Sequence, residues 1–219
     1  MTAVSDSRLS SLDSRLLFIE LTDHLRCPAD HDEAFLVLMP LSIENRQVLA
    51  GHLGCPVCER SFPIIDGVAL FGHTGEREGR GAAEPDTPVG VDGIAAFLGL
   101  EGPGGYVVLV GDAARYATDR AALLGGVHFA ALNAPEGVVE SASVSLMVAP
   151  SLPIKSRSMR GVVLGSDAPQ LGWESEAARV VLPGLRVVGR GEAPRVSELE
   201  LMASAGGWWV AKREIGNRR

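Results

Sequence analysis

The chain has 219 residues, enough for one large domain or for two smaller ones that each bury a core. Hydrophobic residues make up 46% and charged residues 21%, which is typical of a globular protein and excludes an intrinsically disordered one. The formal net charge of -7 argues against a nucleic-acid partner, because phosphate binding depends on lysine and arginine.

The first part of the chain predicts one helix followed by short strands. Leucines recur at helical spacing from residue 7 to residue 24, so we expect a helix there. Two apolar runs, 35–39 and 47–53, predict strands, and residues 61–68 predict a tight hairpin. These pieces are too short to form a core without additional support.

Residues 74–90 interrupt this pattern. They lack hydrophobic periodicity and are rich in glycine, proline and charged residues, which is typical of a flexible linker. We therefore place a domain boundary there. Residues 1–73 form an N-terminal unit, and residues 91–219 form a second unit.

The second unit alternates strand-like and helical runs. Helices are expected at 93–100, 113–124 and 175–181, and short apolar strands at 106–110, 128–132, 144–148, 161–164, 185–188, 199–202 and 208–211. This alternation predicts an α/β fold with a mainly parallel sheet and right-handed crossovers. The last two strands predict an antiparallel hairpin at one edge, where the adjacent Trp208 and Trp209 favour a contact surface.

The three cysteines indicate a metal site in the first unit. Cys55 and Cys58 flank a two-residue turn, which is one half of a zinc knuckle, and Cys27 begins a similar Cys-Pro turn earlier in the chain. Structural zinc takes four sulfur or nitrogen ligands in a tetrahedron. Three cysteines cannot all pair within one chain, and in a reducing compartment close cysteines hold metal more often than they form disulfides.

The spacing leaves the fourth ligand open. Asp30 and His31 stand where a second cysteine would follow Cys27, and imidazole is a commoner zinc ligand than carboxylate, so we favour His31. His24 and His52 are further options. A disulfide or buried free thiols remain the competing interpretations of the cysteines.

The residues around the cysteines resemble a known zinc-ribbon family. Residues 25–28, 51–58 and 62–68 read LRCP, GHLGCPVC and FPIIDGV. They are similar to the family whose best-known member is the small activator subunit of tRNA and protein methyltransferases, over about residues 19–71. The resemblance implies one structural Zn²⁺ held by Cys27, Cys55, Cys58 and a fourth ligand. This sequence departs from the family in lacking a fourth cysteine.

The charge of the ribbon disfavours a nucleic-acid-binding role. Between residues 19 and 73 there are eight acidic residues and only three arginines. Such a surface repels phosphate, so a structural or protein-contacting ribbon is favoured.

The second unit resembles the class I S-adenosylmethionine-dependent methyltransferases over about residues 92–213. Residues 107–112, VVLVGD, stand where that fold has its first strand and glycine-rich loop. Residues 176–188, EAARVVLPGLRVV, are similar to a helix-turn-strand segment of the family, and residues 208–213 suit its terminal edge strand. The resemblance implies a Rossmann-like, mainly parallel sheet.

The cofactor signals of that family are reduced in this chain. Glycines after the first strand admit the cofactor, and an acid after the second strand holds the ribose hydroxyls. Here Gly111 is the one glycine that remains, and Leu109 and Asn133 stand where acids are usual. Residues 150–159 are also too few for a full crossover helix. We therefore predict no catalytic and no cofactor-binding residue, and weak or absent binding of S-adenosylmethionine.

These observations favour a cytoplasmic, non-catalytic, methyltransferase-like zinc-ribbon protein. It would act as a partner or regulatory subunit by contacting another protein, either a methyltransferase or a second copy of itself, with no nucleic acid and no membrane involved. The alternative is an active, divergent methyltransferase that modifies a small molecule or a protein.

Overall fold

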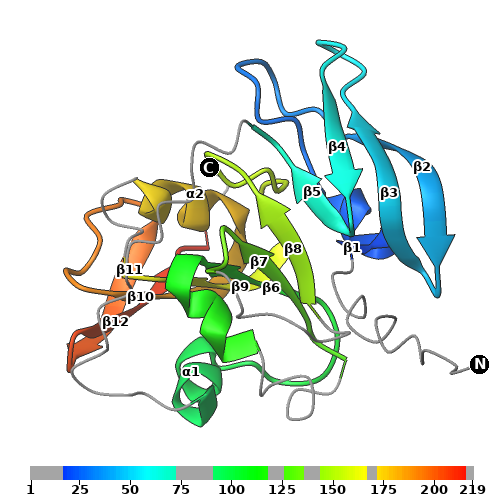
Figure 1. Cartoon of the computed structure of the whole chain (residues 1–219). Helices are drawn as coiled ribbons and strands as arrows, with labels where there is room; N and C mark the ends of the chain where they lie inside the picture. The colour runs from blue at the N-terminus through cyan, green and yellow to red at the C-terminus, as the bar shows by residue number, and fades with distance from the viewer. Residues whose placement is uncertain (1–16, 73–90, 118–125, 136–143, 167–171, 216–219) are drawn as a thin grey trace, which may run out of the picture.

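A computed structural model of the chain describes residues 17–72, 91–117, 126–135, 144–166 and 172–215 (Figure 1). The expected linker at 74–90 lies outside the described residues, and the domain boundaries on either side of it stay a prediction. Within the described segments, none of the helices has the length and hydropathy that a membrane span requires.

The N-terminal unit is made almost entirely of strands, as the short apolar runs predicted. Its elements are β1 (Leu17–Phe18), the 3-10 helix η1 (Ile19–His24), β2 (Val37–Glu44), β3 (Gln47–Gly54), β4 (Ser61–Ile65) and β5 (Val68–Leu70). Strand β3 is the centre of the unit, since β1, β2 and β4 all pair with it in antiparallel register. The strands predicted at 35–39 and 47–53 and the hairpin at 61–68 are confirmed.

The helix predicted from residue 7 to residue 24 is confirmed only in part within its described residues, where a short strand precedes a 3-10 helix. Leu17 and Phe18 form a strand that pairs with β3, and the backbone N–H of Phe18 donates to the Ser145 hydroxyl at 3.0 Å. A six-residue 3-10 helix follows. Leu17 and Leu21 are nevertheless fully buried, so the leucine spacing identified the inward side chains but not the backbone that carries them.

The second unit is a parallel sheet that ends in an antiparallel hairpin. Its elements are α1 (Val91–Leu98), β6 (Tyr106–Val110), the 3-10 helix η2 (Gly111–Ala117), β7 (His128–Leu132), β8 (Val144–Val148), β9 (Met159–Leu164), α2 (Trp173–Val180), β10 (Val181–Arg190), β11 (Leu199–Ala205) and β12 (Trp208–Arg213). The strand order is β8-β7-β6-β9-β10-β12-β11, with β12 antiparallel to both of its neighbours. The order reverses between β6 and β9, which is the switch point of a doubly wound sheet. The α/β fold class is confirmed.

One twelve-stranded sheet runs through both units. Strand β5 of the ribbon pairs in parallel with β8, with Val68 opposite Leu146 and Leu70 opposite Val148. The backbone N–H of Phe71 extends this contact by donating to the Val148 carbonyl at 2.8 Å. The ribbon therefore adds its strands directly to the edge of the parallel sheet.

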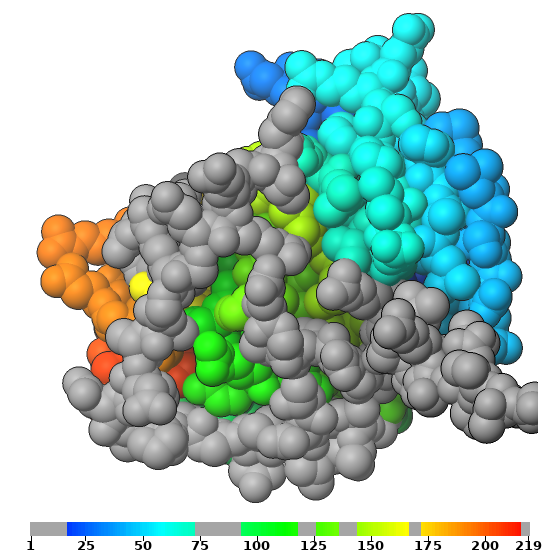
Figure 2. All heavy atoms as spheres, in the orientation of Figure 1, coloured from blue at the N-terminus to red at the C-terminus, as the bar shows by residue number. Residues whose placement is uncertain are grey.

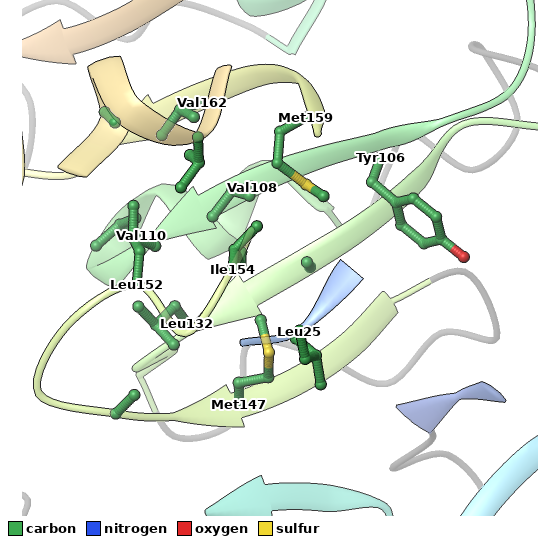
Figure 3. Close-up of a cluster of buried hydrophobic side chains, with 14 of the residues drawn as sticks. Leu25, Tyr106, Val108, Val110, Leu132, Met147, Leu152, Ile154, Met159 and Val162 are labelled. Atoms are coloured by element: carbon green, nitrogen blue, oxygen red, sulfur yellow. The ribbon is translucent and has the colours of Figure 1, made fainter. Parts of the chain in front are cut away.

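A single hydrophobic core also joins the two units (Figure 3). Leu25, from the chain just before the first cysteine, lies beside Ile154 and Met147 of the parallel-sheet unit, and all three are at most 1% exposed. Burying apolar side chains from both sides of the boundary couples the stability of the two units.

The tryptophan pair does not form the contact surface that was expected. Trp208 and Trp209 are 3% and 1% exposed, so both rings belong to the interior. Gly189 on the neighbouring strand makes room for Trp209, because a Cβ at this position would overlap the indole ring. The expectation was wrong because strand sequence alone does not say which face of an edge hairpin is covered.

Candidate metal centre and the carboxyl edge of the sheet

A closed turn between β3 and β4 positions Cys55 and Cys58. The backbone N–H of Cys55 donates to the Arg60 carbonyl at 2.9 Å, and the N–H of Glu59 donates to the Cys55 carbonyl at 3.0 Å. Glu59 adopts a left-handed backbone with φ of 59°. This turn holds both thiols on one side of the chain, as the Cys-x-x-Cys spacing predicted.

A second turn, between η1 and β2, positions Cys27 and His31. The N–H of Cys27 donates to the Ala34 carbonyl at 2.9 Å, and the N–H of His31 donates to the Ala29 carbonyl at 3.0 Å. The loop is thereby closed on itself, so its cysteine and histidine face the other turn.

The donor atoms of the two turns converge. One ligand atom from each of Cys27, His31, Cys55 and Cys58 lies within 4.8 Å of all the others. Cys27 Sγ is 3.6 Å from Cys58 Sγ, and Cys55 Sγ is 3.5 Å from His31 Nε2.

These separations fit a tetrahedral zinc site. Zn–S bonds of about 2.3 Å and Zn–N bonds of about 2.0–2.1 Å at tetrahedral angles place two sulfurs about 3.8 Å apart and a sulfur and a nitrogen about 3.6 Å apart. A disulfide would need about 2.05 Å between sulfurs, and all three cysteines are free. The donor set of three thiolates and one imidazole is the chemistry that Zn²⁺ prefers.

His31 is oriented for this role by its second ring nitrogen. Nδ1 lies 2.7 Å from the Asp32 carbonyl, so it carries the proton and leaves Nε2 free to face the sulfurs. The same hydrogen bond is the main cause that raises the pKa of His31. A metal-binding imidazole is commonly held by such an outer contact.

The other candidate ligands lie elsewhere. The ring of His24 packs against Tyr106 with centroids 5.0 Å apart, and His52 Nδ1 lies 3.4 Å from the Ser61 hydroxyl. Asp30 does not belong to the cluster of converging donors. Of the four alternatives, the structure brings His31 to the cysteines.

The thiols differ in their readiness to ionise. Burial raises the pKa of Cys27 to about 11. Burial also opposes ionisation of Cys55, but backbone N–H groups of Cys58 and Val57, together with the neighbouring thiols, lower its pKa to about 6. Cys55 therefore ionises more readily than Cys27, and the thiolate is the form that binds metal.

The loop between η1 and β2 that carries Cys27 and His31, which we call the metal loop, is bonded to the second unit. The residues that make these bonds were not predicted from the sequence. Glu33 accepts hydrogen bonds from the backbone N–H and hydroxyl of Ser156 at 3.0 and 2.7 Å. Arg179, on α2, lies 3.6 Å from Glu33 and 2.8 Å from Glu176. It also donates to the carbonyls of residues 152 and 154.

The short connection between β8 and β9 is thus the surface on which the metal loop sits. Leu25 forms a bridge with Ile154, and the N–H of Arg26 donates to the Pro153 carbonyl at 3.0 Å. The sequence showed that this connection was too short for a helix. It carried no signal that the ribbon lies against the connection.

The carboxyl edge of the sheet at the switch point is where this fold type binds ligands. Asp112 follows β6 there and Ser166 follows β9. Oδ1 and Oδ2 of Asp112 accept hydrogen bonds from the N–H and hydroxyl of Ser166 at 2.9 and 2.8 Å. Between them, a Cβ at Gly165 would overlap the Asp112 carboxylate. The two loops that flank the switch point are therefore bonded to each other.

Asn133, after β7, is also engaged within the chain. Its side-chain amide donates to the Ala149 carbonyl at 2.8 Å and accepts from the Ala149 N–H at 3.0 Å. This reciprocal pair satisfies the backbone just beyond β8. Asn133 occupies the position where an acid was expected in the methyltransferase pattern, and its polar atoms are turned to the neighbouring strand.

Comparison with known proteins supports the ribbon assignment. The family model described as Trm112p-like protein matches residues 19–67, which is less than a quarter of the chain. Comparison with curated protein sequences gave no match.

Several solved structures are similar to parts of this chain. A chain of the complex containing the Haloferax volcanii Trm112 methyltransferase activator is 21% identical, with a TM-score of 0.36, over 44% of this chain and 50% of that one. The [4+2]-cyclase SpnF is 14% identical, with a TM-score of 0.41, over 52% of this chain and 57% of that one. For an Aquifex aeolicus SAM-dependent methyltransferase the identity is 14%, the TM-score 0.40 and the coverage 56% and 88%.

These structural likenesses assign no function. The chain spans little more than half the length of SpnF and half of the chain from the Haloferax volcanii complex. Residues 19–67, which carry the converging cysteines and histidine, are similar to the Trm112p-like proteins.

Proposed function

We propose that this chain is a non-catalytic, methyltransferase-like protein that is stabilised by one structural Zn²⁺ and acts by contacting another protein. The observation that carries the non-catalytic part is that the two loops at the switch point are bonded to each other through Asp112 and Ser166. The ribbon supplies the metal site, and the parallel sheet supplies the scaffold to which the ribbon is joined.

Cys27, His31, Cys55 and Cys58 would hold the ion. Bound there, zinc would cross-link the turn before β2 to the turn between β3 and β4. Four protein ligands leave no open coordination position, which is typical of a structural rather than a catalytic zinc. The free thiols also favour a reducing compartment, so we infer a cytoplasmic location.

Two features oppose binding of S-adenosylmethionine. Asp112 and Asn133 already make hydrogen bonds within the chain, so a cofactor would have to replace those bonds before it gained any of its own. No carboxylate stands at residue 133 to make a charge-assisted contact with ribose hydroxyls.

Calorimetric titration of the zinc-loaded chain with S-adenosylmethionine tests this proposal. We expect no saturable binding, or a dissociation constant weaker than about 1 mM. A dissociation constant at or below the micromolar range would refute it and favour an active methyltransferase on a small molecule or a protein. Asp112 and Asn133 would then be the first residues to replace.

Elemental analysis tests the metal. Protein purified without added metal should contain about one zinc per chain, because a structural site of this type binds tightly. A folded, metal-free protein that is insensitive to chelators would refute the zinc site and leave the titration with S-adenosylmethionine unaffected.

A further inference from the structure

Exposed apolar side chains are concentrated on the ribbon. In the described part of the chain ten large hydrophobic residues are exposed, and seven of them lie between residues 35 and 65. Four lie on β2, namely Val37, Met39, Leu41 and Ile43, which are 43–77% exposed. Two register shifts fall within this strand, so Met39 lies opposite the exposed His52 and Ile43 opposite the buried Val48, and the four side chains do not all lie on one face of the sheet. We call these four side chains the β2 stripe. Exposed apolar side chains gathered along one strand are candidates for a binding surface.

Strand β2 is also an open edge of the sheet. Among the described residues it pairs only with β3, whereas the opposite edge of the ribbon, β5, is occupied by β8 of the same chain. Figure 2 shows the ribbon, blue to cyan, projecting at one end of the molecule. The ribbon therefore has one edge paired with its own second unit and another edge, β2, that pairs with no further strand among the described residues.

The open edge is protected against indiscriminate strand pairing. Pro40 has no N–H to donate, and the register with β3 shifts between Pro40 and Ser42. These features disfavour the addition of a further strand to β2, while its apolar side chains stay exposed. The surface is thus suited to recognition through side chains rather than through the backbone.

The charge of the ribbon defines the partner. Residues 19–73 contain eight acidic residues and three arginines. Two of these arginines already form ion pairs, Arg46 with Glu20 and Arg26 with Glu176. Four carboxylates of the ribbon are exposed, at Asp32, Glu44, Glu59 and Asp66. A complementary surface must be basic, whereas a second acidic ribbon, an anionic membrane or a nucleic acid would be repelled.

We propose that the β2 stripe is the docking surface for a protein partner that presents apolar side chains rimmed by lysine and arginine. This inference rests on the proposed function and specifies its contact surface. The ribbon then works as an adaptor, with β5 fixed to the parallel sheet of its own chain and β2 turned to the partner.

A model peptide tests this chemistry directly. The probe is a fluorescein-labelled peptide of twelve residues in which valine and isoleucine alternate with lysine and arginine, and fluorescence anisotropy is measured with the full, zinc-loaded chain. We expect saturable binding that weakens with added salt and that falls at least about tenfold in Leu41→Glu. A peptide with glutamate in place of the basic residues should not bind.

Leu201→Glu is the matched control. Leu201 is 49% exposed on β11, at the other end of the sheet, so this substitution adds the same charge to a different exposed strand and should leave peptide binding unchanged. Met39→Asn, which adds no charge, should also weaken binding if the apolar stripe is the site. Both stripe variants must keep their zinc content and melting temperature.

Four outcomes overturn the proposal. Absence of peptide binding does so, as does equal binding by wild type and the stripe variants. A wild-type dimer in sedimentation that Leu41→Glu abolishes assigns the stripe to a second copy of the chain. Peptide binding that requires deletion of residues 1–16 assigns it to the chain's own N-terminus. None of these results changes the titration with S-adenosylmethionine, so the proposed function is tested separately.

Discussion

The metal end of the ribbon and the carboxyl edge of the sheet are both places where polar side chains from separate loops meet, and they differ in what those side chains bind. At the ribbon, one ligand atom from each of four residues converges, and all four lie within 4.8 Å of one another. At the sheet edge, Asp112 and Ser166 satisfy each other's hydrogen bonds. Convergence of thiol and imidazole groups, which are metal ligands, indicates a ligand site, whereas a carboxylate bonded to a backbone N–H and a hydroxyl indicates a structural contact.

The largest effect is expected from removing a metal ligand. Cys55→Ser should abolish stoichiometric zinc and lower the free energy of unfolding by more than about 3 kcal/mol, because metal binding energy is folding energy at such a site. Elemental analysis and thermal unfolding with and without a chelator measure both effects. Val57→Ala, a neighbouring exposed position in the same turn, should retain zinc. A Cys55→Ser protein that melts like wild type would remove the basis for calling this end a ligand site.

Leu25→Ala tests whether the ribbon and the parallel-sheet unit unfold together as one cooperative structure. The side chain is fully buried in the core that joins the ribbon to the parallel sheet, so its truncation should cost about 2–5 kcal/mol. The tryptophans, all in the second unit, and zinc release should report the same transition in denaturant. Two separate transitions would instead support independent domains. Leu41→Ala, at 77% exposed, should cost little.

A smaller loss is expected at the carboxyl edge. Asp112→Asn replaces one acceptor oxygen by an amide nitrogen, so a hydrogen bond from Ser166 is lost and stability should fall by about 1–3 kcal/mol. Chemical denaturation measures this loss, and calorimetry should still show no binding of S-adenosylmethionine. If Asp112→Asn gained cofactor binding, the contact between Asp112 and Ser166 would be blocking a site that is otherwise able to bind S-adenosylmethionine.

The smallest effect is expected where the metal loop meets the second unit. Glu33→Gln weakens the contacts to Ser156 and Arg179, but Glu33 is 37% exposed and solvent screens the charge, so we expect a loss below about 1 kcal/mol. Hydrogen exchange of residues 152–158 should increase. Asp32→Asn, on the same loop, is the control. No change in exchange for either variant would show that zinc and the shared core alone hold the loop in place.

Local patterns in the sequence predicted much of this structure. The Cys-x-x-Cys turn, the strands of the ribbon and the strands of the parallel sheet all depend on residues close in the chain, and each was found near its predicted range. The predicted helix at 7–24 includes the 3-10 helix η1, but the leucine spacing suits a longer helix and did not show that residues 17 and 18 form a strand. The burial of Trp208 and Trp209 was missed because it depends on packing partners such as Phe97 and Tyr116, which are distant in sequence.

The sequence by itself determined the ligand types, the alternation of strands and helices, and the loss of acids at residues 109 and 133. Only the tertiary structure decided that His31, rather than Asp30, meets the cysteines, that β5 pairs with β8, and that Asp112 bonds to Ser166. Those outcomes depend on the register between segments far apart in the chain. Spacing along one segment limits which side chains can meet, but the packing of the segments against each other selects the ones that do.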